Sequence, residues 1–235
     1  MNQLTSKFVL QLRFWFLFIC LNFNLSTNAQ TFINFESGAL FTSINDIRNG
    51  NNGTLFSLKN DFPTSVSPFL RLRAGFLING EHYFSFLYAP LKIIESGIRE
   101  NNILFDEKDF KANLPIEVVY KFNSYRFTYN RRIIIKDNFK FGLGLSAKIR
   151  DAGVSLKNKE LLSENFSIGF VPLVNLLANY DLSQKMGIDF FGEGIIASKG
   201  RAIDISLSGR YILTENLQAN IGYRLLEGGA DGTNR

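Results

Sequence analysis

The chain contains very little of the chemistry that enzymes and metalloproteins use. Its one cysteine is Cys20 and its one histidine is His82. Cys20 lies in an N-terminal segment with the features of a signal peptide, so the mature chain has no thiol chemistry, no disulfide and no cysteine metal ligand. Glu227 and Asp231 offer two carboxylates, whereas a calcium site needs about six oxygens. We therefore expect no metal, no cofactor and no catalytic residue.

Charge of one sign and long apolar runs are also scarce. Removal of the N-terminal segment takes away Lys7 and Arg13, which lowers the formal net charge from +5 to +3. No basic block remains, so nucleic acid is not an expected partner. After the first 29 residues no apolar run reaches 18 residues, which excludes a transmembrane helix.

The first residues have the order of a secretory signal peptide. Lys7 and Arg13 precede a short apolar run, and the small residue Ala29 follows a polar stretch. This order predicts a signal peptide over residues 1–29, cleaved after Ala29, and a mature domain over residues 30–235. The apolar run is shorter than the roughly 20 residues that a membrane-spanning helix needs.

Helical periodicity is absent from the mature chain, and period-two alternation takes its place. Between Phe139 and Arg150 the odd positions are apolar and the even positions are polar, charged or glycine. Such alternation predicts β-strands with one oily face and one wet face. We expect strands at roughly 31–44, 68–78, 82–94, 114–135, 138–155, 165–181, 186–198, 201–213 and 217–227. In the fourth strand the parity of the aromatic residues changes, which predicts a β-bulge at Asn123–Ser124.

The connections between these strands alternate in length. Short turns fall at Asn79–Gly80, 136–138, 181–185 and 214–216, and longer polar links fall at 45–54, 95–113 and 157–165. Short turns on one side and long loops on the other are typical of an outer-membrane β-barrel. We therefore predict an all-β, transmembrane, antiparallel up-and-down barrel of about ten strands, with about eight as the alternative.

Most charges within the predicted strands share one parity, which predicts an almost charge-free face toward lipid and a polar face toward the interior. The charges either line a narrow anion-favouring path or pair with one another and fill the interior, and buried charges are expected to pair. Lys148 to Asp151 could also stand at the outer mouth, near lipopolysaccharide phosphates. The residues expected to line the interior are Arg71, Arg73, Arg126, Lys140, Lys148, Arg150, Asp189, Glu193, Asp204, Arg210 and Arg224, with Glu36 as a further candidate.

Several stretches together resemble a family of uncharacterised bacterial outer-membrane β-barrel proteins of the Bacteroidetes type. They are SFLYAPLKI (85–93), YKFNSYRFTYNRR (120–132), GLGLSAKIRDAGVSL (142–156), GFVPLVN (169–175) and GYRLLEGGAD (222–231). The resemblance implies an outer-membrane location and, in most members, one further strand. It implies no biochemical activity.

We accordingly expect a monomeric outer-membrane barrel, structural or with narrow solute passage, and without catalysis. Its expected partners are outer-membrane lipid, lipopolysaccharide and the barrel-assembly machinery. An outer-leaflet lipid-modifying enzyme is one alternative, but His82 and Ser85 are three residues apart and would face opposite sides of a strand. A surface adhesin or ligand-binding barrel, acting through residues 45–54 and 95–113, is the other.

The predicted strands number nine, whereas antiparallel closure requires an even number. Strand 217–227 would run in the same direction as the first strand, so the two could not pair antiparallel. We expect strand 217–227 to pair with 201–213 and to lack a closing partner. On this interpretation the chain is C-terminally truncated and lacks one strand of about 10 residues.

Overall fold

The computed structural model describes residues 28–43, 45–49, 52–62, 66–197 and 200–230, and every regular element in them is a β-strand. The expected signal peptide lies outside the described residues apart from Asn28 and Ala29. The strands are β1 (Ala29–Leu40), β2 (Asp46–Ile47), β3 (Phe56–Ser57), β4 (Ser67–Ile78), β5 (His82–Ala89), β6 (Lys92–Ile98), β7 (Ile103–Phe105), β8 (Lys108–Phe110), β9 (Pro115–Ile135), β10 (Phe139–Lys157), β11 (Leu162–Asp181), β12 (Met186–Ala197), β13 (Gly200–Thr214) and β14 (Leu217–Ala230).

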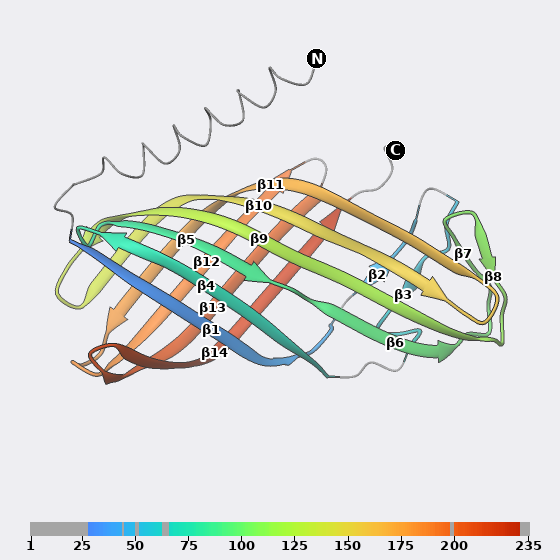
Figure 1. Ribbon diagram of the computed structural model, residues 1–235, viewed down its shortest axis with the longest axis horizontal. Coiled ribbons are helices and arrows are strands. Elements are labelled where there is room, and N and C mark those ends of the chain that lie inside the picture. The colour runs from blue at the N-terminus through green and yellow to red at the C-terminus, as the bar shows by residue number, and fades with distance from the viewer. Residues whose placement is uncertain (1–27, 44, 50–51, 63–65, 198–199, 231–235) are drawn as a thin grey trace, which may run out of the picture.

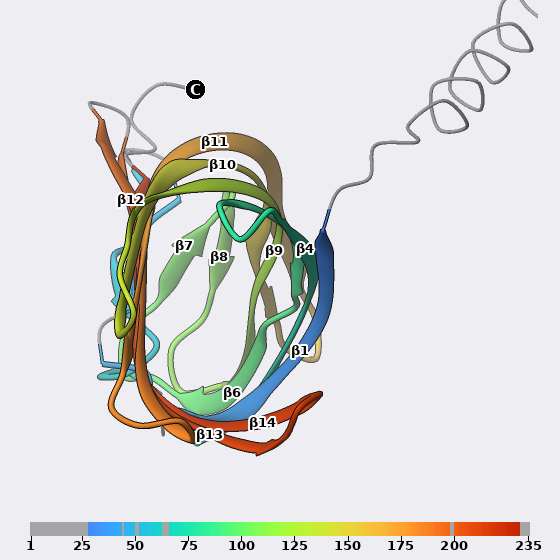
Figure 2. The ribbon, with the colours of Figure 1, turned by 90° about the vertical axis from the view of Figure 1, so that its left-hand side faces the viewer.

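One antiparallel sheet dominates the fold and curls into a half-barrel (Figures 1 and 2). Its order is β1-β4-β5-β9-β10-β11-β12-β13-β14, and β6 continues the line of β5 along β9. Pro90 separates β5 from β6, where a missing amide hydrogen interrupts the ladder. The prediction of an all-β, antiparallel, sequentially paired fold is confirmed.

The two edge strands of the sheet run in the same direction. β1 pairs with β4 and β14 pairs with β13, and within the described residues no ladder joins β1 to β14. Residues 201–213 therefore do flank strand 217–227 on one side, and its other edge has no backbone partner there. In Figure 2 the two edges meet at the lower side of the curled sheet.

Short turns gather at one end of the sheet, which we call the turn end, and the two longest connections, between β1 and β4 and between β6 and β9, lie at the other, which we call the loop end. The longer link expected at 157–165 is wrong: β10 and β11 continue to Lys157 and from Leu162, so residues 158–161 form a short turn. At the turn end Asn79 and Gly80 both have positive φ, of 51° and 71°, and Glu81 N–H donates to the Ile78 carbonyl. This is the type I′ geometry that the Asn-Gly pair predicts. At the loop end the long strands β9, β10 and β11 extend beyond the shorter strands β12 to β14 (Figure 1).

The bulge expected at Asn123–Ser124 is not present. β9 and β10 pair without interruption from Glu117 to Arg132, and their register shifts only between Phe141 and Gly142. The even-numbered residues of β9 face the interior on both sides of the expected bulge. The aromatic residues change parity because the inward positions of β9 are apolar toward one end of the strand, at Ile116 and Val118, and polar toward the other, at Arg126 and Asn130.

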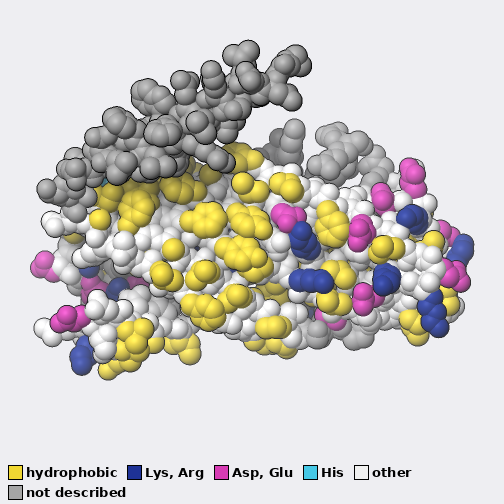
Figure 3. All heavy atoms as spheres, in the orientation of Figure 1, with side chains coloured by type: hydrophobic (Ala, Val, Ile, Leu, Met, Phe, Trp, Pro, Cys, Tyr) yellow, Lys and Arg dark blue, Asp and Glu magenta, His cyan; other side chains and the backbone are white. Residues whose placement is uncertain are grey.

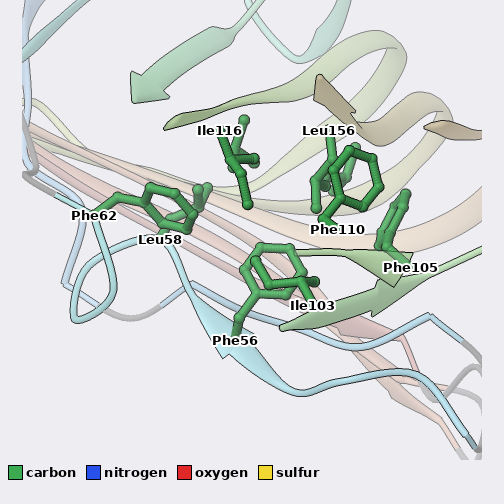
Figure 4. Packing of buried hydrophobic residues seen from close by; sticks show 10 residues of the cluster. Phe56, Leu58, Phe62, Ile103, Phe105, Phe110, Ile116 and Leu156 are labelled. Carbon is green, nitrogen blue, oxygen red and sulfur yellow. The ribbon is translucent and has the colours of Figure 1, made fainter. Parts of the chain in front are cut away.

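The loop end contains a hydrophobic cluster that the sequence analysis did not predict (Figure 4). Two small hairpins, β2–β3 and β7–β8, pair outside the main sheet and contribute apolar side chains to the cluster. The cluster also includes the inward residues of β9 and β10 nearest this end. We call it the loop-end core, and its members are Phe56, Leu58, Phe62, Ile103, Phe105, Phe110, Ile116, Val118, Val154 and Leu156.

Candidate functional site: the charged interior

Charged side chains from six strands meet in the middle of the interior. Each strand contributes one residue because residues of one parity share a face, and the curl of the sheet brings those faces together. Four of the six residues are less than 7% exposed. We call the set the central network: Glu36 on β1, Arg71 on β4, Arg126 on β9, Glu193 on β12, Asp204 on β13 and Arg224 on β14.

Asp204 is the common partner of all three arginines. Its Oδ2 accepts from Arg126 at 2.6 Å and from Arg71 at 3.3 Å, and its Oδ1 accepts from Arg224 at 2.5 Å. Arg126 also forms an ion pair with Glu193, which reaches it from the opposite wall. Arg126 is 1% exposed, so these ion pairs are shielded from solvent.

The central network also joins the two edges of the sheet. Arg224 donates from Nε and Nη2 to the two carboxylate oxygens of Glu36, at 2.8 and 2.9 Å. This is the bidentate arrangement that orients both partners most strongly. Arg71 lies 3.4 Å from the same carboxylate. A side-chain bridge therefore connects β1 to β14 where no backbone ladder does.

A second set of ion pairs lies at the turn end. Asp181 accepts from Lys140 at 2.9 Å and from Arg210, and Arg210 lies 3.6 Å from Asp189. Asn179 Nδ2 donates to Asp189 Oδ1 at 2.8 Å, the same oxygen that Arg210 approaches. Lys140, Asp189 and Arg210 were expected in the interior, but Asp181 was missed because it was read as part of a turn.

Neutral polar side chains fill the space between these two sets. Asn130 donates to Asn175 at 2.8 Å, and Asn175 donates to Ser146 at 3.0 Å, which is itself 3.1 Å from Thr128. Asn130, Asn175 and Thr128 are 0% exposed. Their alternation with apolar neighbours was visible in the sequence, but the contacts between strands were not.

Three predicted interior cations pair with no acid within the described residues. Arg73 donates to Ser85 at 3.2 Å and lies over the Phe191 ring at 4.8 Å. Lys148 lies over the Phe122 ring at 4.8 Å, and Arg150 makes one long contact of 3.4 Å. Lys148 is 3% exposed, so it faces the interior and does not stand at the outer mouth.

His82 and Ser85 face opposite sides of β5. The ring of His82 is on the outer face, where Nδ1 lies 3.0 Å from the Tyr129 hydroxyl. Ser85 is 2% exposed on the inner face and contacts Arg73. The two side chains are therefore not within hydrogen-bond reach of one another, which nucleophilic catalysis by such a pair would require.

No protein-family model matches the chain, and no curated protein is detectably similar to it. Among the described residues there is no helix of the length and apolar character that a membrane crossing needs. The same part of the chain contains no group of three or more histidine, cysteine, aspartate or glutamate residues placed to hold a metal ion.

Proposed function

We propose that the protein is a small bacterial outer-membrane β-barrel protein, structural in role and without catalysis, whose interior admits little or no solute. The observation that carries the proposal is the apolar outer face. Large apolar side chains are exposed on every long strand of the sheet, as Ile33, Leu72, Leu145, Phe170 and Ile221 illustrate at 80%, 44%, 65%, 67% and 85% exposure. Monomeric soluble proteins rarely expose apolar patches of this extent.

The height of the apolar band fits a bilayer. On β10 the outward residues stay apolar from Phe141 to Ile149, a run of about nine residues, close to the 9–11 of a membrane-spanning strand. The next outward residue is Asp151, which forms an ion pair with Lys121 at 2.7 Å. In Figure 3 the apolar side chains occupy the middle of the visible face, and charges gather toward the loop end.

Aromatic side chains flank the band as they do at membrane interfaces. Toward the loop end Tyr88 and Tyr125 stack with their ring centroids 5.3 Å apart. Toward the turn end Tyr211 is 46% exposed beside the turn that precedes Met186. Rings with a polar tip suit this position because one end is apolar and the other is wet.

The contents of the interior favour a structural role over solute passage. The central network spans it from wall to wall, the hydrogen-bonded pair Asn130 and Asn175 lies on one side, and the loop-end core lies on the other. A barrel of about eight strands encloses only enough space for its own side chains.

Two measurements test this proposal separately. Refolded protein mixed with lipid vesicles is expected to float with them in a density gradient and to resist extraction at high salt. In planar bilayers the same preparation is expected to give no sustained single-channel steps. Failure to float would reject the membrane role, whereas floating protein with regular conductance steps would reject only the closed interior.

The loop-end core supports one further role, ligand binding at the cell surface. Outer-membrane loops are often exposed and irregular, but here two hairpins share a packed core with β9 and β10. The Leu104 amide donates to the Thr54 hydroxyl at 2.9 Å, which ties the two links together. An ordered platform of this kind could present a binding surface. Loss of surface binding by cells after deletion of residues 99–113, with the barrel still assembled, would support it.

A further inference from the structure

The interior beside the central network contains two cations, Lys148 and Arg150, that form no ion pair with an acid of the described residues. We propose that Lys148 and Arg150 form a binding site for a small inorganic anion. The site lies between the central network and the loop-end core. It depends on the fold of the interior and does not depend on whether the outer face meets lipid.

The two cations occupy neighbouring inward positions on β10. Register pairs Lys148 with Arg126 on β9 and Val171 on β11, and it pairs Arg150 with Ser124 and Gly169. Lys148 and Arg150 are two residues apart on one strand, so their side chains lie on the same face. Both therefore project into one part of the interior, next to Arg126.

The acids near Lys148 and Arg150 already have partners. Both oxygens of Asp204 accept from arginines of the central network, both oxygens of Glu36 accept from Arg224, and Glu193 pairs with Arg126. The next interior acid, Glu95, is in register with Val118, farther toward the loop end. In the part of the chain that the structure describes, six interior cations therefore face three acids around the central network, counting Arg73 with Lys148 and Arg150.

Three hydrogen-bonding groups in this part of the interior remain available to a ligand. Lys148 is 3% exposed, and its ammonium lies over the Phe122 ring without a hydrogen bond or ion pair to the rest of the described chain. The Nε of Arg150 is buried and has no hydrogen-bond partner. Ser124 accepts from Arg126 Nε at 2.8 Å, which leaves its own hydroxyl proton free to donate. Cationic groups and hydroxyls together suit a halide or an oxyanion.

Burial of Lys148 and Arg150 without a counter-charge has a cost in free energy. A buried ammonium without a counter-charge is strongly disfavoured, so it pairs or loses its proton. An anion bound between Lys148 and Arg150 would neutralise the excess charge and satisfy the Arg150 Nε at the same time.

The test uses the refolded protein in detergent with chloride and inorganic phosphate as probes. Thermal unfolding is followed at constant ionic strength while a bulky organic sulfonate is replaced by one probe. We expect a saturable rise in Tm of a few degrees with at least one probe, because a ligand of the folded state stabilises by mass action. Chloride-35 NMR lines are expected to broaden with the protein and to sharpen if phosphate competes.

Variants separate a site from a general salt effect. Lys148→Met is expected to lose the saturable rise and the line broadening, whereas Lys157→Met, exposed on the same strand, is expected to keep both. Arg150→Gln provides the same comparison if Lys148→Met does not fold. An equal response in all variants, or no saturable response to either probe in the unaltered protein, would overturn the proposal.

Discussion

The two halves of the interior differ in a way that one pair of strands makes plain. On β9 the inward residues toward the turn end include Arg126 and Asn130, whereas toward the loop end they include Ile116 and Val118. The outer faces of the sheet show the opposite order. Beside Arg126 the outer residue Phe127 is 53% exposed, and beside Val118 the outer residue is the exposed Glu117. One continuous ladder therefore passes from an inside-out arrangement to the arrangement of a soluble protein.

This contrast shows that alternation in a strand specifies faces but does not specify their surroundings. With the proposed membrane location, the polar face lies inward where lipid would cover the outer face, and the apolar face lies inward where water would cover it. The transition falls near the Lys121–Asp151 pair, where the outer face becomes charged. Substitutions in each half, and at the boundary between them, show how independently the two halves fold.

The largest effect is expected from Arg126→Ala in the charged half. The change would leave Asp204 and Glu193 buried with one partner fewer, and breaking a buried ion pair typically costs about 3–5 kcal/mol. Urea unfolding is expected to show loss of the whole sheet. It can be followed by tyrosine fluorescence, because residues 30–235 contain no tryptophan, or by heat-modifiable migration on gels. Because strands from both edges meet at this network, a purely local change would contradict its global role.

A loss of similar size but smaller reach is expected from Phe110→Ala in the loop-end core. Phe110 is 0% exposed, and removing a buried phenyl ring costs about 3–5 kcal/mol. The hairpins β7–β8 and β2–β3 do not belong to the main sheet, so they are expected to open alone. Limited proteolysis should cut within residues 99–113 while heat-modifiable migration stays unchanged. Simultaneous loss of the sheet would show that the two halves unfold together.

The sequence predicts the strands better than the contents of the interior. Alternation over Phe139 to Arg150 was enough to predict β10 and its faces, because period two is a local property. The loop-end core depends on contacts between links far apart in the chain, such as Phe56 with Phe105, whose ring centroids are 6.3 Å apart. The large apolar residues within the otherwise polar links were the available signal. The partners of Arg126 depended on curvature, which alternation does not encode.

A smaller effect is expected when a charge enters the outer face. Leu143 is 44% exposed beside the charged half, and arginine on a lipid-facing strand costs about 2–4 kcal/mol at mid-membrane. Leu143→Arg is therefore expected to impair assembly into vesicles, scored as the heat-modifiable fraction. Ser208→Arg is the matched interior control, because Ser208 lies between Asp189 and Gly222 in register. Equal tolerance of the two changes would contradict the assignment of the faces.

The smallest effect is expected at the boundary between the halves. Lys121 and Asp151 pair at 2.7 Å on the outer face, with side chains 35% and 20% exposed. Pairs in contact with water typically contribute about 0–1 kcal/mol, because solvation competes with their attraction. A double-mutant cycle with Lys121→Met and Asp151→Asn, followed by urea unfolding, is expected to give a coupling below about 1 kcal/mol that decreases with added salt. A coupling as large as that of the Arg126 ion pairs would mean that this pair is shielded from water, and the boundary of the apolar band would then lie nearer the loop end than Asp151.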